Sequence, residues 1–208
     1  MLKLFYSPGA CSMASHIALE EAGAQYERVR VILAGGEQRG EAYAKINPKG
    51  RVPALATDQG VLTETTAILA YVAQTHPQAK LAPLDDPFAF ARVQEFNAFL
   101  SSTVHVSHAH RVRGSRWSDD PAVIEGLKLK VAQNMTDAFQ LIETKMLAGP
   151  YVLGDRFTVA DGYLFTMARW LEGDSVDIKK FPKVNDHQKR VADRPAVQRI
   201  LAAEKAAA

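Results

Sequence analysis

The chain has 208 residues, of which 47% are hydrophobic, and its 25 Lys and Arg are nearly balanced by 23 Asp and Glu. This composition excludes a largely disordered chain, and the length favours two small domains. Because no block of basic residues is present, the sequence gives no sign of a surface that binds nucleic acid through its charge. The single cysteine rules out an internal disulfide; with neither a signal-peptide pattern nor a long apolar segment, we expect a cytoplasmic protein without a membrane partner.

The first 33 residues predict a strand, a helix and a second strand. An apolar run at residues 2–6 ends at Ser7-Pro8-Gly9 and indicates a strand followed by a turn. Residues 12–22 predict a helix that ends before Gly23, and residues 26–33 predict another strand. Two strands joined by one helix run parallel with a right-handed crossover, so this region is a βαβ unit.

Residues 34–77 complete an α/β domain. A polar stretch leads to an Asn-Pro-Lys-Gly turn at 47–50, and two short strands at 52–56 and 61–63 form a hairpin. Residues 64–75 predict a helix that stops before Pro77. The order βαβ, hairpin, helix describes a compact four-stranded domain.

Beyond residue 77 the strand signals nearly vanish. Residues 78–87 contain Pro83 and paired aspartates and suggest a linker. Helical periodicity then covers four segments, which are residues 88–110, 121–147, 159–171 and 182–208. We expect an all-helical second domain whose last four residues fray. Its densest basic run, Arg111, Arg113 and Arg116, is expected on a solvated surface.

Cys11 lies at the start of the first predicted helix, directly after the first strand and its turn. Backbone N–H groups and the positive end of the helix dipole stabilise a thiolate at such a position. Ligands also bind at the carboxyl ends of strands in open α/β sheets. Cys11 is either a small buried apolar residue or a chemical group, and its position favours the second interpretation.

Two further positions suit a ligand. A cis Val52–Pro53 bond would turn the backbone of Val52 toward an extended peptide, although a trans proline at a strand start is the commoner arrangement. In Thr-Glu-Thr-Thr at 63–66, the backbone amides of a helix start favour an anion, and Glu64 would accept an ammonium group. Simple helix capping explains the same four residues equally well.

Several ordered motifs together resemble bacterial beta-class glutathione transferases. The segments YSPGACS at 6–12, NPKGRVP at 47–53 and LTET at 62–65 are similar to the family's glutathione-binding half. FTVAD at 157–161 resembles its capping box, in which Thr158 caps a helix and Asp161 reaches back to the backbone. The resemblance runs over nearly the whole chain and implies a thioredoxin-like domain at 1–77, a linker at 78–87 and a helical bundle at 88–208.

This resemblance also implies a function and a site. The protein would be a homodimeric detoxification enzyme that uses glutathione as co-substrate, needs no metal, and conjugates the thiolate to small hydrophobic electrophiles. Cys11 and His105 would be catalytic, with Cys11 against the glutathione sulfur. The implied glutathione-binding residues are Cys11, Ser12, Arg51, Val52, Pro53, Glu64, Thr65, Ser102 and His105.

The chain departs from the family pattern at a few positions. Val106 stands where a lysine is frequent, and Ala98 stands where an asparagine is expected. Asn97 is one position away, and because one residue rotates a helical side chain by about 100°, it cannot inherit that role. A lysine that is frequent after the second strand is also missing near residues 35–36. These departures bear on affinity and on the choice of electrophile.

The remaining chemistry-bearing residues lie in the helical half. The spacing of His105, His108 and His110 does not favour a metal site, because only the first two share a helical face and no other ligand lies near them in sequence. His108 and His110 are expected on the surface or in the second-substrate pocket. The aromatic and methionine residues that either line this pocket or fill the core are Phe99, Trp117, Met167 and Trp170.

Two other functions remain open from the sequence. Cys11 could act as a monothiol in a glutathione-dependent thiol-disulfide oxidoreductase, with glutathione as the resolving thiol. The chain could also be a non-catalytic binding module, because a fold does not fix a function.

Overall fold

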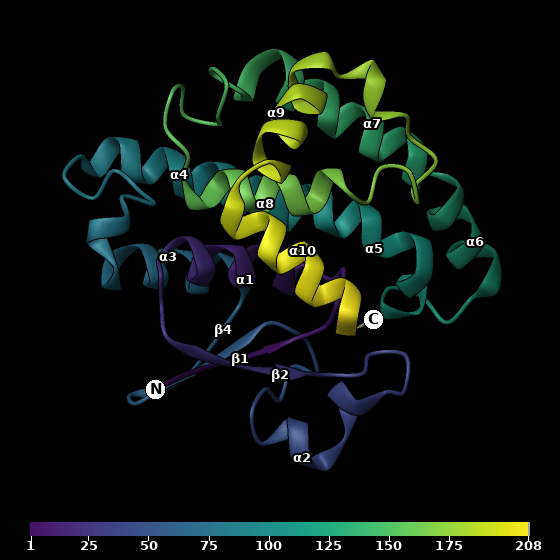
Figure 1. Ribbon diagram of the computed structural model, residues 1–208. Helices are drawn as coiled ribbons and strands as arrows, with labels where there is room; N and C mark the ends of the chain where they lie inside the picture. Colours follow the sequence, from purple (N-terminus) through teal and green to yellow (C-terminus); the bar gives the residue numbers. More distant parts are fainter. Residues whose placement is uncertain (208) are drawn as a thin grey trace.

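The computed structural model, which describes residues 1–207, contains an α/β part and a helical part that lie against each other (Figure 1). This confirms the expected fold class, a thioredoxin-like domain followed by a helical bundle. The elements of the first part are β1 (Leu2–Tyr6), α1 (Ser12–Glu21), β2 (Tyr26–Arg30), α2 (Glu41–Ala44), β3 (Ala54–Thr57), β4 (Gly60–Thr63) and α3 (Thr65–Thr75).

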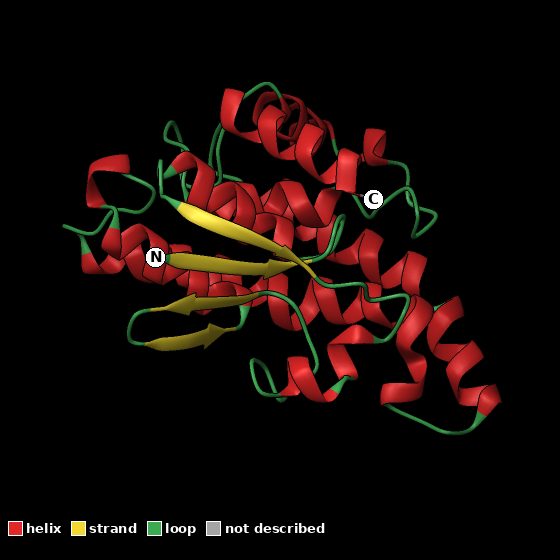
Figure 2. Ribbon diagram, turned by 60° about the horizontal axis from the view of Figure 1, so that its bottom comes forward, coloured by secondary structure: helices red, strands yellow, loops and turns green. Residues whose placement is uncertain are grey.

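The four strands form one sheet in the order β2-β1-β3-β4 (Figure 2). β1 runs parallel to β2 and antiparallel to β3, so Leu4 faces Arg28 on one side and Leu55 on the other. Side chains alternate between the two faces of a strand. Leu4 therefore packs in the cluster that α1 and α3 share, whereas Phe5 packs in a separate cluster on the opposite face.

That opposite face is covered by a segment for which the sequence predicted only a polar stretch. It contains a 3₁₀ turn, Glu37–Arg39, and the single-turn helix α2. Tyr43 of α2 is buried in the cluster with Phe5, and its hydroxyl donates a hydrogen bond to the backbone oxygen of Arg51 at 2.9 Å. This one aromatic anchors the segment beneath the sheet.

The helical part begins with one long helix that contains a π turn. Its elements are α4 (Pro87–Phe99), the π turn Leu100–Val104, α5 (His105–Arg113), α6 (Pro121–Leu129), α7 (Val131–Leu141), α8 (Val159–Ala168), α9 (Pro182–Ala192) and α10 (Pro195–Ala207). The single helix expected from residue 182 is divided in two because Pro195 cannot continue a helix. The expected fraying is also wrong for the described residues, since α10 continues to Ala207 and buries Glu204.

The two parts share a continuous hydrophobic core that fixes their relative position. Leu4 of the sheet and Tyr163 of α8 belong to the same buried cluster, and α1 packs against α8 and α10 (Figure 1). Gly162 permits a close approach of α8 to α1, because a Cβ atom there would lie 3.1 Å from Cγ2 of Ile17. Within residues 1–207, no helix has the length and hydropathy that a membrane crossing requires.

Candidate active site

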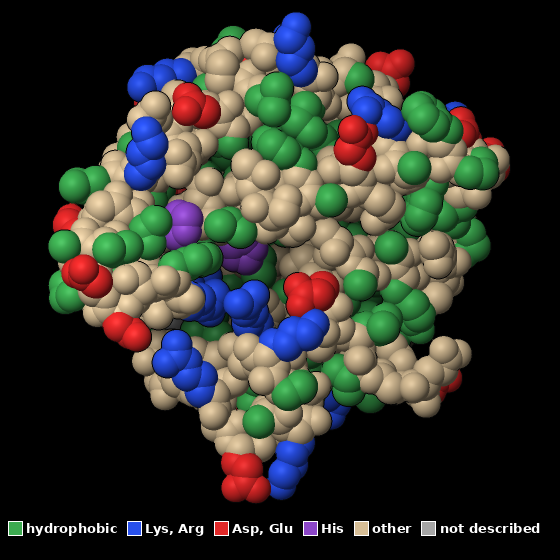
Figure 3. Space-filling model, turned by 180° about the vertical axis from the view of Figure 1, so that it is seen from behind, with side chains coloured by type: hydrophobic (Ala, Val, Ile, Leu, Met, Phe, Trp, Pro, Cys, Tyr) green, Lys and Arg blue, Asp and Glu red, His purple; other side chains and the backbone are tan. Residues whose placement is uncertain are grey.

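A cavity of about 520 Å³ lies between the two parts of the molecule. The first part supplies the loop after β1, including Cys11, together with residues near Arg39 and the loop that contains Arg51. The second part supplies one face of α5, including His105, together with Trp170. Figure 3 shows histidine side chains next to several Lys and Arg side chains at a hollow in this face.

Cys11 is the N-cap of α1 and lines the cavity, but its thiol is buried. The Sγ atom donates a hydrogen bond to the backbone oxygen of Val52 at 3.3 Å. Burial raises the pKa of Cys11 above its ordinary value, and a hydrogen bond from Thr65 and the charge of Arg113 oppose this effect without cancelling it. Burial thus acts against the thiolate stabilisation that the helix start was expected to give Cys11.

Ser12 is fully buried and holds the loop closed. Its hydroxyl donates to the backbone oxygen of Ser7 and accepts from the backbone N–H of the same residue, both at 3.1 Å. Since this hydroxyl is used within the protein, a contribution of Ser12 to glutathione binding would come from its backbone N–H. That contribution stays a prediction.

The peptide bond between Val52 and Pro53 is cis, the less common of the two arrangements open from the sequence. Arg51 precedes it, and the backbone oxygen of Arg51 accepts hydrogen bonds from Tyr43 at 2.9 Å and from Nδ2 of Asn47 at 2.6 Å. Val52 lines the cavity while Pro53 is buried behind it. The loop thus presents backbone groups on a rigid support, which suits an extended peptide ligand.

Glu64 and Thr65 begin α3 just outside the residues that line the cavity. Glu64 has a φ of 72°, which is rare for a residue other than glycine, and its carboxylate pairs with Nζ of Lys49 at 2.6 Å. Thr65 is buried and hydrogen-bonds to the Cys11 side chain. The start of α3 is therefore connected to the site through Thr65, whereas Glu64 faces solvent and a cation.

One of two neighbouring serines faces the cavity. Ser101 lines it, whereas Ser102 is exposed and donates a hydrogen bond to the backbone oxygen of Ala98 at 2.8 Å. Ser101 lies four residues before His105, a spacing that places both side chains on one side of a helix. The predicted role of Ser102 stays untested, and Ser101 takes its place at the wall of this cavity.

His105 lines the cavity and stays neutral over a wide pH range. Burial, followed by the charges of Arg113, His108 and Arg116, lowers the pKa of His105 to about 3. Its ring packs against Trp170 with 5.1 Å between centroids. A neutral imidazole at this place can accept or share a proton but adds no positive charge.

His108 and Trp170 form the floor of the helical side. Their rings stack with 4.0 Å between centroids, and Nδ1 of His108 contacts Oδ2 of Asp174 at 2.7 Å. Nε1 of Trp170 donates to the backbone oxygen of Gly9 at 3.0 Å, which connects the helical part to the loop after β1. His108 thus lies in the wall of this cavity, next to Trp170.

Sequence reasoning missed several residues of the cavity. Arg113 and Arg116 line it, as do Gln38 and Arg39 from the supposed polar stretch. Arg116 is exposed, as the sequence predicted, whereas Arg113 is half-buried. Arg111 instead pairs with Asp174. Arg113 is about 80° around the helix from His105 and Arg116 lies in the 3₁₀ turn after α5, so helical spacing gave no clear signal for either.

The aromatic residues divide between cavity and core. Trp117 and Trp170 line the cavity, but Met167 is fully buried in the core and Phe99 lies outside the lining. Within the described residues 1–207, no group of three or more His, Cys, Asp or Glu side chains is placed to hold a metal ion.

Comparison with known proteins places this architecture in a family. Residues 1–74 match the model of the glutathione S-transferase N-terminal domain, and residues 119–204 match that of the C-terminal domain. The chain belongs to the glutathione S-transferase family. A glutathione S-transferase of Escherichia coli O157:H7 is 34% identical over 206 residues, with 98% of each chain covered.

Two solved structures of this family are especially informative. A glutathione transferase homologue from Sulfitobacter, crystallised with bound glutathione, is 43% identical, has a TM-score of 0.94 and matches over 96% of each chain. The beta-class transferase of Sphingomonas chungbukensis is 36% identical with a TM-score of 0.85, and the match covers 97% of this chain and 98% of that one. The beta-class resemblance noted in the sequence is thereby confirmed.

Proposed function

We propose that this chain is a glutathione transferase that conjugates the thiolate of glutathione to a small electrophile. The observation that carries this proposal is the cavity at the start of α1, where Cys11, the cis-proline loop and His105 meet across the two parts of a transferase fold. The similarity to a Sulfitobacter structure with bound glutathione supports the same conclusion.

In this proposal glutathione lies extended along the first part of the molecule. The backbone of Val52 pairs with its cysteinyl unit, and the start of α3 near Thr65 receives its γ-glutamyl end. The sulfur then rests against Cys11, at the positive end of α1 and within the field of the cavity's arginines. Both influences lower the pKa of the ligand's thiol, which is near 8.5 when a thiol is free in water.

The chain's own cysteine has a supporting role. Because burial raises the pKa of Cys11, the thiolate that attacks is that of glutathione. Cys11 presents a neutral thiol that already donates to Val52 and can be turned toward the incoming sulfur. This favours conjugation over the monothiol oxidoreductase.

We further propose that the enzyme acts in the cytoplasm, that it serves in detoxification and that it forms a homodimer. The proposed bounds are 1–77 for the first domain, 78–87 for the linker and 88–208 for the helical domain. The wall near Val112 and Trp117 would hold the apolar body of the electrophile. At the start of α4, Phe88 is an apolar side chain that is 77% exposed, and in this proposal a second copy covers it. Sedimentation of wild type and Phe88→Ser tests the dimer; a monomeric wild type would contradict it.

The test of the function is the reaction with 1-chloro-2,4-dinitrobenzene. The thiolate forms a C–S bond at the ring carbon, chloride leaves with its electron pair, and the thiol proton passes to solvent. We expect a rate well above that of glutathione alone, and Arg51→Gln and His105→Ala to reduce it. A rate equal to that of the uncatalysed reaction, together with no heat of glutathione binding in calorimetry, would contradict the proposal.

A further inference from the structure

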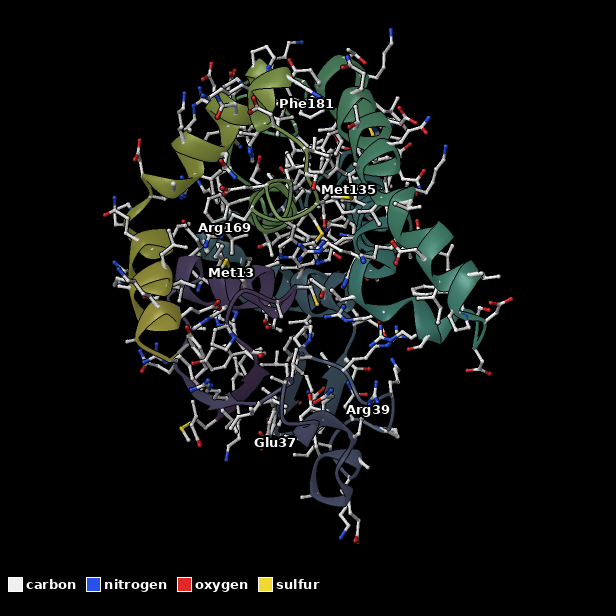
Figure 4. All side chains as sticks on the ribbon, turned by 90° about the vertical axis from the view of Figure 1, so that its right-hand side faces the viewer. Met13, Glu37, Arg39, Met135, Arg169 and Phe181 are labelled. Atoms are coloured by element: carbon white, nitrogen blue, oxygen red, sulfur yellow. The ribbon has the colours of Figure 1, made fainter. Side chains whose placement is uncertain are left out.

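Four arginines converge on the cavity. Arg39 and Arg51 belong to the first part of the molecule, and Arg113 and Arg116 lie at the end of α5 and in the turn after it. We refer to them as the arginine quartet. Figure 4 shows Arg39 on the side of the first part that lies below the helices of the second. No Asp or Glu is among the residues that line the cavity within the described chain.

The quartet is not neutralised by the protein. Among residues 1–207, no carboxylate lies within ion-pair distance of these four guanidinium groups. Neighbouring cations do have partners, since Arg111 pairs with Asp174 and Lys49 with Glu64. A protein of nearly balanced charge has thus concentrated uncompensated positive charge at one cavity.

The four charges act on the same space. The pKa of Arg116 is lowered first by burial and then by the charges of Arg113, Arg51 and Arg39. The charges of Arg113, Arg116 and Arg51 also help to keep His105 neutral. Like charges held close together repel each other, and an anion bound between them relieves this repulsion.

Glutathione alone leaves half of the quartet free. In the proposed binding mode its γ-glutamyl carboxylate lies at the start of α3, and Arg39 and Arg51 are the cavity cations on the peptide's side that can pair with its glycine carboxylate. Arg113 and Arg116 lie instead on the helical wall, beside Val112 and Trp117. In the proposed function this is the wall that the second substrate contacts.

We propose that Arg113 and Arg116 bind an anionic group of the second substrate, so that the preferred acceptors are electrophiles with a carboxylate or a similar anion on an apolar or aromatic body. This inference rests on the proposed transferase function and narrows its substrate class. Guanidinium groups match carboxylates in shape and form charge-assisted hydrogen bonds with them. The apolar wall would hold the body of the acceptor while its reactive carbon faces the glutathione sulfur.

The experiment compares two acceptors that differ only in charge, 4-chloro-3-nitrobenzoate and 4-chloro-3-nitrobenzamide. In both, glutathione sulfur replaces chloride at the ring carbon, and each kcat/KM is divided by the uncatalysed rate constant. We expect wild type to prefer the benzoate by about tenfold, the size of one charge-assisted contact. The double variant Arg113→Gln/Arg116→Gln should lose this preference with the KM for glutathione unchanged.

The control is Lys128→Gln, which removes one exposed cation on α6 outside the cavity and should preserve the preference. A wild type without preference, or a preference that survives the double substitution, would overturn the proposal. A rise in the KM for glutathione with an equal loss for both acceptors would also overturn it and would leave the transferase function standing.

A second readout separates the two proposals. If neither acceptor is conjugated, the anion site is judged by the binding of unreactive 3-nitrobenzoate and 3-nitrobenzamide, followed by tryptophan fluorescence. The proposed function is judged separately, by the reaction with 1-chloro-2,4-dinitrobenzene. Tighter binding of the benzoate that disappears in the double variant supports the site. Equal binding of both compounds overturns it.

Discussion

Glu204 of the C-terminal helix holds the loop that carries Cys11, and its removal should disturb both stability and glutathione binding. Oε2 of Glu204 accepts a hydrogen bond from the backbone N–H of Gly9 at 2.9 Å, and Oε1 contacts Nδ1 of His16 at 3.1 Å. Glu204 is 3% exposed and His16 is fully buried. With Trp170 bound to the backbone oxygen of Gly9, the loop is held from both sides.

The size of the effect follows from the groups left without a partner. Glu204→Ala strands the N–H of Gly9 and the ring nitrogen of His16, and each buried polar group without a partner costs about 1–3 kcal/mol. Because the contact with Gly9 is only partly buried and water can replace it, we expect the free energy of unfolding to fall by about 3 kcal/mol. This is a large share of the roughly 5–15 kcal/mol that stabilises a typical domain. Glu204→Gln keeps the shape and one acceptor, and should lose about 1 kcal/mol.

The assay combines urea unfolding with calorimetric titration of glutathione. Lys205→Ala, which changes the exposed neighbour of Glu204, is the matched control and should resemble wild type. Glu204→Ala should also weaken glutathione binding, because Gly9 lines the cavity. If Glu204→Ala unfolds within about 0.5 kcal/mol of wild type and binds glutathione equally well, the idea that α10 positions this loop is refuted.

Three further predictions concern buried groups. Since burial raises the pKa of Cys11, iodoacetamide should alkylate it at pH 7.5 far more slowly than it alkylates free glutathione, and rapid labelling at pH 7 would contradict this. Since the pKa of His105 is lowered to about 3, the folded chain takes up this proton only near pH 3 while the unfolded chain takes it up near 6.5. The contribution of neutral His105 to stability is therefore complete above pH 6.5 and declines as the pH falls toward 3. His105→Gln should reduce the loss of stability on acidification. An NMR titration that places the pKa of His105 near 6.5 would contradict this prediction. Asp161→Ala should lower the free energy of unfolding by more than about 3 kcal/mol, because Asp161 accepts hydrogen bonds from the backbone N–H groups of Val152 and Thr158 and contacts the ring of His187. Unfolding in guanidinium chloride measures this loss, and a loss below about 1 kcal/mol would contradict the prediction.

Local chemistry explains which parts of the fold could be predicted from sequence. β1 and the start of α1 agree with the prediction because an apolar run, a Pro-Gly turn and good helix formers follow one another. The capping box of Thr158 and Asp161 is present as expected, since both partners lie within one helical turn. These features depend on neighbours in sequence, and short-range patterns report them faithfully.

The features that were missed depend on contacts between distant segments. Cys11 is buried and hydrogen-bonds to the loop at Val52, and no local pattern in the sequence reveals this burial or the raised pKa that results from it. The π turn Leu100–Val104 was not indicated by the sequence pattern, which predicted one continuous helix there. The order at the end of α10 arises because Glu204 meets Gly9 across the molecule.

The position of the glutathione sulfur is the most direct test of the account as a whole. A crystal structure of the protein soaked in glutathione should show this sulfur in contact with Sγ of Cys11 at the start of α1, with the tripeptide backbone paired to Val52. A structure in which the tripeptide binds outside the cavity, or with its sulfur away from Cys11, would contradict it.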